Sequence, residues 1–244
     1  AHTEGSRAFI TYVGQWLDHA KFSEDPEHRE KADAMVALLT PVAKAFLTDR
    51  ALDTCVIGQQ VFGGHGYIRE WGQEQLVRDT RITQIYEGTN GIQAMDLMGR
   101  KIVSNNGKFF EYFADEVADF ITENQNEPSL EGYLQPLAAA IERLSDVTEH
   151  VIGSAGENPA EVGAAAVDYL DLFGLTAEAY LWARMVKGAA RRAENDTSGF
   201  YTGKLKTARF FYDRLLPQTV ALAEGIRSGS DSMMALSGDE FAVS

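Results

Sequence analysis

The chain has 244 residues, 45% of them hydrophobic and 24% charged, a composition typical of folded proteins with enough length to bury a core. Its formal net charge of −14 argues against a nucleic-acid-binding protein, because neutralisation of phosphates drives that binding. No run of roughly eighteen apolar residues is present, so we expect no membrane span. A single cysteine, Cys55, excludes an internal disulfide and fits a cytoplasmic location.

The N-terminal segment carries Glu4, Arg7 and Asp18 within an amphipathic pattern, so we expect no signal peptide. The sequence starts at Ala1 and enters this helical pattern within a few residues, which favours a segment cut from a larger protein. Removal of an initiator methionine before a small residue is the alternative.

Hydrophobic residues recur with helical periodicity along nearly the whole chain. A first helix is predicted over 5–22, followed by a break at Ser23–Pro26. Its inward face is predicted to hold Phe9, Tyr12, Val13, Trp16 and Leu17. A second, long helix is predicted over 27–62, with a kink or a restart at Pro41. Its predicted inward residues are Ala34, Leu38, Val42, Ala45, Leu52, Val56 and Ile57.

The glycine-rich segment 63–66 is expected to end this second helix, because glycine readily takes the left-handed conformation at a helix C-terminus. A short segment over 73–84 then leads to a second break. The next helix is predicted to begin near Thr89 or Asn90 and to run to about 104. Asn90 followed by Gln93 resembles a capping box.

The second half of the chain has the same helical pattern. Further helices are predicted over 108–125, 129–152, 158–195 and 203–228, followed by a loosely packed tail over 228–244. No segment alternates with period two over a strand length. The predicted fold is therefore all-α, a helical bundle.

Charge is distributed unevenly in this second half. Acidic residues greatly outnumber basic ones over 105–182, whereas basic residues cluster over 184–214. The basic cluster could bind an anionic ligand such as a CoA phosphate. We favour the other interpretation, in which the acidic and basic helices pair with each other or with a neighbouring domain.

Glu87 lies on the second break, with Gly88 directly behind it and mostly apolar or neutral neighbours. These neighbours would desolvate the carboxylate if it were buried, and such a carboxylate is suited to removing a carbon-bound proton. The upstream glycines, Gly63, Gly64 and Gly66, lack the spacing of a dinucleotide fingerprint and the Lys-Ser/Thr pair of a P-loop. They indicate close approach of another surface to the backbone.

Other reactive residues favour structural roles. The five histidines are scattered without metal-ligand spacing, so no metal site is predicted. Cys55 lies on the apolar face of its predicted helix and is interpreted as a packed thiol. Arg78, Asp79 and Arg81 are interpreted as forming a structural ion pair.

Three blocks carry a family resemblance: QVFGGHGY at 60–67, LVRDTRI at 76–82 and IYEGTNGIQ at 85–93. In this order and spacing they resemble the C-terminal helical domain of acyl-CoA dehydrogenases. The stretch KLKTARFFYDRLLP at 204–217 resembles larger bacterial members of the family, of the 3-methylmercaptopropionyl-CoA dehydrogenase type. The resemblance implies a C-terminal helical domain over 1–104, without its first helix, and an additional helical region with a tail over 105–244.

The resemblance implies that Glu87 removes the α-proton of an acyl-CoA thioester while the β-hydride passes to the N5 atom of FAD. It implies that Gly88 lines the acyl-CoA site. Thr89, Asn90 and Gly91 match positions that contact FAD, which fits the free N–H groups of a helix N-terminus. The matches to a segment that touches the adenosine part of FAD, usually from the neighbouring subunit, are Gln60, Val61, Phe62, Gly63 and Gly64.

The resemblance further implies a homo-oligomer and an electron-transfer flavoprotein as electron acceptor. Many family members have glutamine where Gly91 stands, so one flavin contact is expected to differ. The N-terminal helical domain and the middle β-domain are absent from the sequence, so we expect the chain alone to lack FAD and to be inactive. Two alternatives stay open: a flavoprotein of the same fold without dehydrogenase activity, and a non-enzymatic helical interaction module.

Overall fold

The structure is a computed structural model, and it describes residues 1–242. Within these residues it contains helices and no strand, which confirms the predicted all-α fold. The α-helices are α1 (His2–Phe22), α2 (Pro26–Phe62), α3 (Gly64–Tyr67), α4 (Gln73–Arg81), α5 (Asn90–Met95), α6 (Lys108–Glu123), α7 (Leu134–Ala155), α8 (Ala160–Ala193), α9 (Phe200–Phe210) and α10 (Gln218–Arg227). Short 3-10 turns are η1 (Arg69–Trp71), η2 (Ile82–Gln84), η4 (Val103–Asn105), η5 (Pro128–Leu130) and η7 (Glu240–Ala242), and π-helical segments are η3 (Asp96–Ile102) and η6 (Phe211–Leu215).

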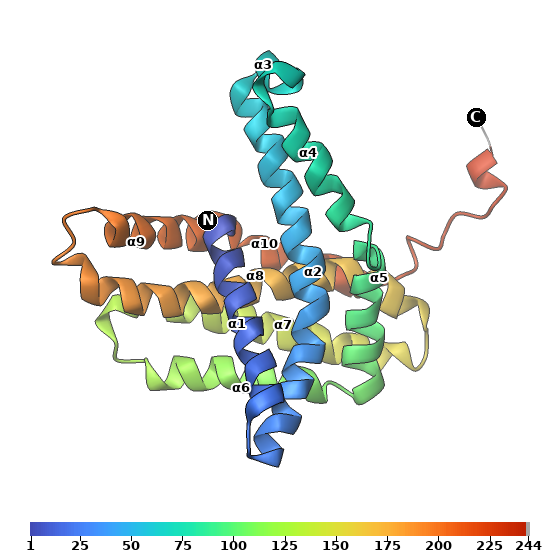
Figure 1. The fold of residues 1–244 in the computed structure, drawn as a ribbon. Coiled ribbons are helices and arrows are strands. Elements are labelled where there is room, and N and C mark those ends of the chain that lie inside the picture. The colour runs from blue at the N-terminus through green and yellow to red at the C-terminus, as the bar shows by residue number, and fades with distance from the viewer. Residues whose placement is uncertain (243–244) are drawn as a thin grey trace.

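The helices form two groups that cross each other (Figure 1). The antiparallel pair α1 and α2, with α5 beside α2, runs across a layer formed by α6, α7, α8, α9 and α10. Helix α8 is central, because it packs against α1, α2, α5, α7, α9 and α10. The upper half of α2 and the antiparallel α4 leave this body as a helical hairpin with α3 at its tip. Residues 231–242 extend away from the body.

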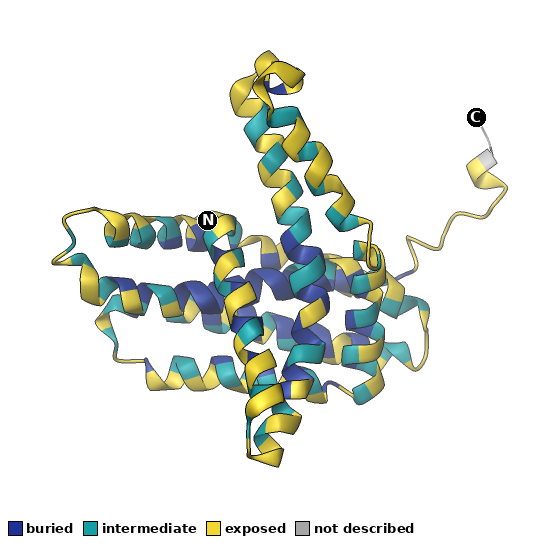
Figure 2. Cartoon of the chain, viewed as in Figure 1, coloured by how far each residue is buried: buried dark blue, intermediate teal, exposed yellow. Residues whose placement is uncertain are grey.

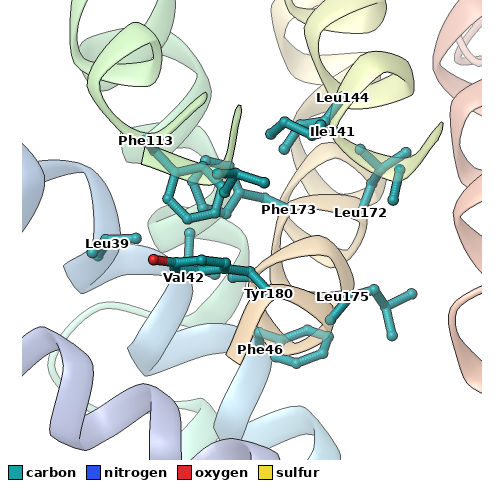
Figure 3. Close-up of a cluster of buried hydrophobic side chains, with 14 of the residues drawn as sticks. Leu39, Val42, Phe46, Phe113, Ile141, Leu144, Leu172, Phe173, Leu175 and Tyr180 are labelled. Carbon is teal, nitrogen blue, oxygen red and sulfur yellow. The ribbon is translucent and has the colours of Figure 1, made fainter. Parts of the chain in front are cut away.

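The core lies where the two groups cross. Figure 3 shows Phe46 and Val42 of α2 facing Phe173 and Leu175 of α8, with Phe113 of α6 against the same cluster. The rings of Phe113 and Phe173 stack at a centroid distance of 4.9 Å. Burial of such large side chains is the main favourable contribution to folding, at about 1.5–3 kcal/mol for each. One apolar core therefore holds both groups of helices together.

Local sequence explains where α2 begins and ends. The Asp25 side chain accepts a hydrogen bond from the Glu27 backbone N–H at 3.0 Å, and Pro26 occupies the first helical position. Gly63 follows the last residue with a φ of 59°, as predicted for the glycine-rich stop. Pro41, in contrast, does not restart the helix: α2 continues through it without interruption.

Two other boundaries differ from the sequence prediction. The segment predicted as one helix over 203–228 consists of α9, the π-helical η6 and α10, and Pro217 separates the last two. Proline has no N–H to continue the preceding helix, so a new one begins at Gln218. Helix α7 begins at Leu134 rather than near 129, because the 3-10 turn η5 precedes it. The tail is exposed beyond Ser230, as predicted for the residues described, whereas Ser230 itself is buried against Glu161.

Candidate functional site

Glu87 lies on the loop between η2 and α5, on the break predicted from the sequence. Its φ is 53°, in the left-handed region that residues with a side chain rarely adopt, and Gly88 follows with a φ of 85°. The Glu87 side chain is exposed, so the other residues of this chain do not remove water from its carboxylate. The neighbouring Ile85 and Tyr86 are also about half exposed, at 46% and 49%. The loop thus presents a carboxylate beside apolar groups on an open face.

Hydrogen bonds from α5 hold this unusual backbone. The Thr89 hydroxyl accepts from the Ile92 N–H at 3.4 Å, which makes Thr89 the N-cap of α5. The Gln93 side chain donates to the Glu87 carbonyl at 3.1 Å. The predicted capping box on Asn90 is therefore wrong, because Asn90 is already the first residue of the helix.

Asn90 instead binds across to α2. Its amide donates to Asp49 at 2.7 Å and to the Thr48 hydroxyl at 2.9 Å, and its side-chain oxygen accepts from Lys44 at 2.7 Å. The same Lys44 ammonium donates to the Gly88 carbonyl at 2.8 Å. These bonds fix the loop to α2.

Sequence reasoning missed Lys44 and Asp49. Burial lowers the pKa of Lys44, while the nearby Asp49 and Glu87 carboxylates raise it in part. The only sequence signal was a lysine within the apolar face of a long helix, between Val42 and Ala45. That pattern more often describes a lysine whose stem packs and whose ammonium reaches water.

The second predicted group of site residues lies at the tip of the hairpin. Gln60, Val61, Phe62, Gly63 and Gly64 are all exposed, and a Cβ atom added to Gly63 or Gly64 would meet nothing within 4 Å. The backbone there is open to close approach by another surface.

Gly66 has a different role from the other glycines at the tip. A Cβ atom at this position would lie 2.4 Å from the carbonyl oxygen of Gln59, so glycine is required where α3 folds back on α2. His65 also stays within the turn, since its ring lies edge-on to Trp71 at a centroid distance of 5.2 Å.

The structure does not bring the two predicted groups together. Thr89, Asn90 and Gly91 lie beside Glu87, whereas 60–64 lie at the far end of the hairpin (Figure 1). The intervening segment 73–84 has a helical length of roughly 18 Å.

Most residues of the hairpin are exposed (Figure 2), and many of them carry large apolar side chains. Val61 is 80% exposed and Tyr67 81% exposed. The other exposed apolar side chains of the hairpin are Val56, Ile57, Phe62, Ile68, Trp71, Leu76 and Ile82. The prediction that Val56 and Ile57 point inward is wrong, because this part of α2 extends beyond the core. The same prediction is wrong for Leu17 of α1, which is 51% exposed. Exposed apolar side chains gathered on one element are typical of an interaction surface.

Within the residues described, no group of three potential metal ligands exists and no helix could span a membrane. The Cys55 thiol is half-buried and lies 3.3 Å from the Thr80 hydroxyl. The ion pair predicted around Asp79 is wrong: its carboxylate accepts from Gln75, and Arg81 donates to Gln84.

The predicted pairing of acidic and basic helices is present in part. Arg184 lies 4.0 Å from Glu116, and Arg191 lies 3.7 Å from Glu127. Both pairs join α8 to the acidic part of the chain. Glu116 also accepts hydrogen bonds from the hydroxyls of Tyr12 and Tyr180, each at 2.8 Å, so α1, α6 and α8 meet at one carboxylate.

Comparison with known proteins supports the family resemblance. Residues 113–237 match the family described as "Acetyl-CoA dehydrogenase C-terminal like", and residues 25–102 match "Acyl-CoA dehydrogenase, C-terminal domain". A 3-methylmercaptopropionyl-CoA dehydrogenase from Ruegeria pomeroyi is 34% identical over 97% of this chain and 40% of its own length. The broad-specificity linear acyl-CoA dehydrogenase FadE5 from Mycobacterium tuberculosis is 28% identical over 97% of this chain and 40% of its own length. The chain thus spans about two-fifths of the length of these relatives.

A solved structure has the same fold. Caenorhabditis elegans ACDH-11 in complex with C11-CoA superposes with a TM-score of 0.70 at 20% identity, over 87% of this chain and 34% of that one. The first family match alone covers more than half of the 244 residues. The chain therefore belongs to the acyl-CoA dehydrogenase family and corresponds to its C-terminal helical portion.

Proposed function

We propose that this chain is the C-terminal part of an FAD-dependent acyl-CoA dehydrogenase and that Glu87 is the base that removes the α-proton of the thioester. The observation that carries the proposal is the backbone of Glu87, at a φ of 53° between η2 and α5. A non-glycine residue in this region costs on the order of 1–3 kcal/mol, and such strain persists where surrounding bonds impose it. Here Gln93 binds the Glu87 carbonyl and Lys44 binds the Gly88 carbonyl.

The consequence is a carboxylate held on an open face rather than folded onto its own helix. Ile85 and Tyr86 flank it, and Ile92 is 61% exposed nearby in sequence. These apolar groups would remove water from the carboxylate once a thioester and the remaining domains cover them. The role of Gly88 as a lining residue of the acyl-CoA site is part of the same proposal.

FAD fits the residues present in two places. Bound FAD would supply the acceptor for the β-hydride. The first place is the start of α5, where Thr89, Asn90 and Gly91 leave the backbone accessible: no atom lies within 4 Å of a Cβ built on Gly91. The second is the exposed tip at 60–64, where Gly63 and Gly64 are equally open.

Because the two places lie at opposite ends of the hairpin, we propose that they serve two different flavins in a homo-oligomer. The exposed apolar side chains of the hairpin support such an interface, since water-exposed apolar surface of this extent is unfavourable in a monomer. We further propose that 1–104 carry these sites, that 105–244 form an additional helical region, and that an electron-transfer flavoprotein receives the electrons. The chain alone, lacking the remaining domains, is expected to be inactive and free of FAD.

The test uses the complete protein that carries this chain, at the length of its relatives. Addition of acyl-CoA thioesters of increasing chain length should bleach its flavin absorbance. The Glu87→Gln variant should keep the flavin but reduce it about 10² to 10⁴ times more slowly, the loss typical of a missing acid–base group. Glu111→Gln, which changes an exposed carboxylate on α6 outside the hairpin, is the control and should behave as the wild type.

Three outcomes would contradict the proposal. Near-normal reduction of the Glu87→Gln variant would remove Glu87 as the base. A flavin that stays oxidised with every thioester would indicate a relative of the same fold without dehydrogenase activity. A complete protein without flavin would leave a helical interaction module.

A further inference from the structure

Helices α1, α8 and α9 border an open groove of about 640 Å3 that none of the proposed flavin or thioester residues line. We call it the α1/α8/α9 groove; its walls include Arg7 and Ala8 of α1, Leu181 and Arg184 of α8, and Phe200 and Lys204 of α9. Its volume is in the range of small-ligand sites. It also contains part of the basic cluster noted in the sequence, which the proposed function does not use.

The charge of the groove differs from that of the molecule. Arg7, Arg184 and Lys204 line it against one carboxylate, Glu4, although the whole chain carries a formal charge of −14. Glu4 pairs with Lys204, and Glu116, outside the lining, lies 4.0 Å from Arg184, so Arg7 is the cation of the groove without a carboxylate partner among the described residues. A concave, cationic surface on an acidic protein attracts anions to that place and repels them elsewhere.

Arg7 is the most available of the three cations. It is exposed, and its guanidinium makes no hydrogen bond or ion pair with any residue of the described part of the chain. It therefore keeps the two parallel N–H donors with which arginine binds a carboxylate.

Arg184 and Lys204 are held in place by aromatic rings. The Arg184 guanidinium lies 5.4 Å from the ring centroid of Tyr180, and the Lys204 ammonium lies 5.8 Å from that of Trp182 and 5.2 Å from that of Phe200. These contacts limit the motion of the two side chains before any ligand arrives, which lowers the entropic cost of binding.

The rest of the lining favours an alkyl chain over a nucleotide. Ala8, Leu181 and Met185 provide an aliphatic floor, and Phe200 is 60% exposed at the edge. Backbone N–H groups at a helix N-terminus can bind a phosphate. At the N-terminal end of α9, however, the Asp196 carboxylate already accepts hydrogen bonds from the backbone N–H groups of Ser198 and Tyr201. An anion in this groove must be held by side chains.

We propose that the α1/α8/α9 groove binds an amphipathic carboxylate of the fatty-acid class. Its head would lie on Arg7 and Arg184, and its chain would lie over Leu181, Met185 and Phe200. This site is separate from the thioester site and does not depend on the assignment of Glu87.

The experiment uses calorimetry to measure the binding of octanoate to the complete protein that carries this chain. Octanol, acetate and AMP are the comparison probes. Octanoate should bind. Octanol lacks the negative charge and acetate lacks the alkyl chain, so each of these two probes should bind at least about tenfold more weakly than octanoate. Arg7→Gln should weaken octanoate binding about tenfold, a loss of about 1.4 kcal/mol. This variant removes no hydrogen bond or ion pair within the described residues, so it should fold as the wild type. Lys206→Gln, the same charge change on the exposed side of α9, is the control and should bind octanoate normally.

Added salt should weaken octanoate binding, since the attraction is between exposed charges. Equal affinity for octanol and octanoate, or unchanged binding by Arg7→Gln and by an Arg184→Gln variant, would overturn the proposal. AMP binding that exceeds octanoate binding and depends on Arg7 would also overturn it, in favour of a nucleotide site.

Discussion

The ammonium group of Lys44 lies 2.7 Å from the side-chain oxygen of Asn90, although 46 residues separate them in the chain. The same ammonium binds the carbonyl of Gly88. One half-buried lysine on α2 therefore positions both the first residue of α5 and the loop that carries Glu87. The backbone of Glu87 can keep its left-handed conformation only if such neighbours prevent the loop from relaxing.

Replacement of Lys44 by Met should loosen this loop. The variant loses a charged donor to two acceptors, a change that costs on the order of 1.5–3 kcal/mol. Amide hydrogen exchange of 85–92 should become faster, with little change in α8. Arg29→Met, an exposed cation on the same helix, should leave the exchange of 85–92 unaltered. Equal exchange in the two variants would mean that Gln93 and Thr89 suffice to hold the loop.

Gly174 of α8 should not tolerate a methyl group. A Cβ atom there would lie 2.4 Å from the ring of Phe46, at the contact between α2 and α8. Gly174→Ala should lower the free energy of unfolding by about 1–3 kcal/mol, the usual cost of overpacking. Urea denaturation measures this change.

Gly188 is the matched control on the same helix. No atom lies within 4 Å of its added Cβ, and the residue is exposed. Gly188→Ala should raise the free energy of unfolding by up to about 1 kcal/mol, because alanine favours the helix. Destabilisation by both substitutions to the same extent would show that the contact between Gly174 and Phe46 is not as tight as described.

The stability of the protein should depend on pH through Glu178. Burial raises the pKa of this carboxyl, and the hydrogen bonds from His2 and Ser6 lower it in part. Between the ordinary glutamate pKa, about 4.3, and the raised value, the folded state binds more protons than the unfolded state. The free energy of unfolding therefore falls as pH rises through this window.

Glu178→Gln should remove this part of the pH dependence. Glutamine can keep the hydrogen bond with Ser6 without a buried charge, so the variant should lose less stability as pH rises above about 4.3. Burial also raises the pKa of Asp168 and Asp171, but these two residues are present in the wild type and in the Glu178→Gln variant alike. The difference between the two unfolding curves thus isolates Glu178; parallel curves would contradict the assignment.

The helical periodicity predicted the elements well where one face of a helix meets one core. The boundaries of α1, α2, α6 and α8 lie within a few residues of the prediction because caps and glycine stops are local signals. Periodicity failed for Val56 and Ile57, since an apolar stripe has the same pattern whether it faces the core or an interface outside the chain.

Part of the candidate site could likewise be predicted from the sequence and part could not. The break at Glu87 and the motif blocks around it are contiguous in sequence, so they could be read directly. Lys44 and Asp49 could not be read, because their partners are brought to them only by the packing of α5 on α2. The groove between Arg7, Arg184 and Lys204 depends on three helices whose order in space no local pattern specifies.

The sequence by itself determined the all-α class and, through three short blocks, the family, because both rest on local order along the chain. Tertiary structure alone decided that Glu87 is exposed, that the two groups of proposed flavin contacts lie apart, and that the basic cluster borders a groove. The physical reason is that burial and charge environment are properties of segments brought together from distant parts of the chain, not of any segment alone.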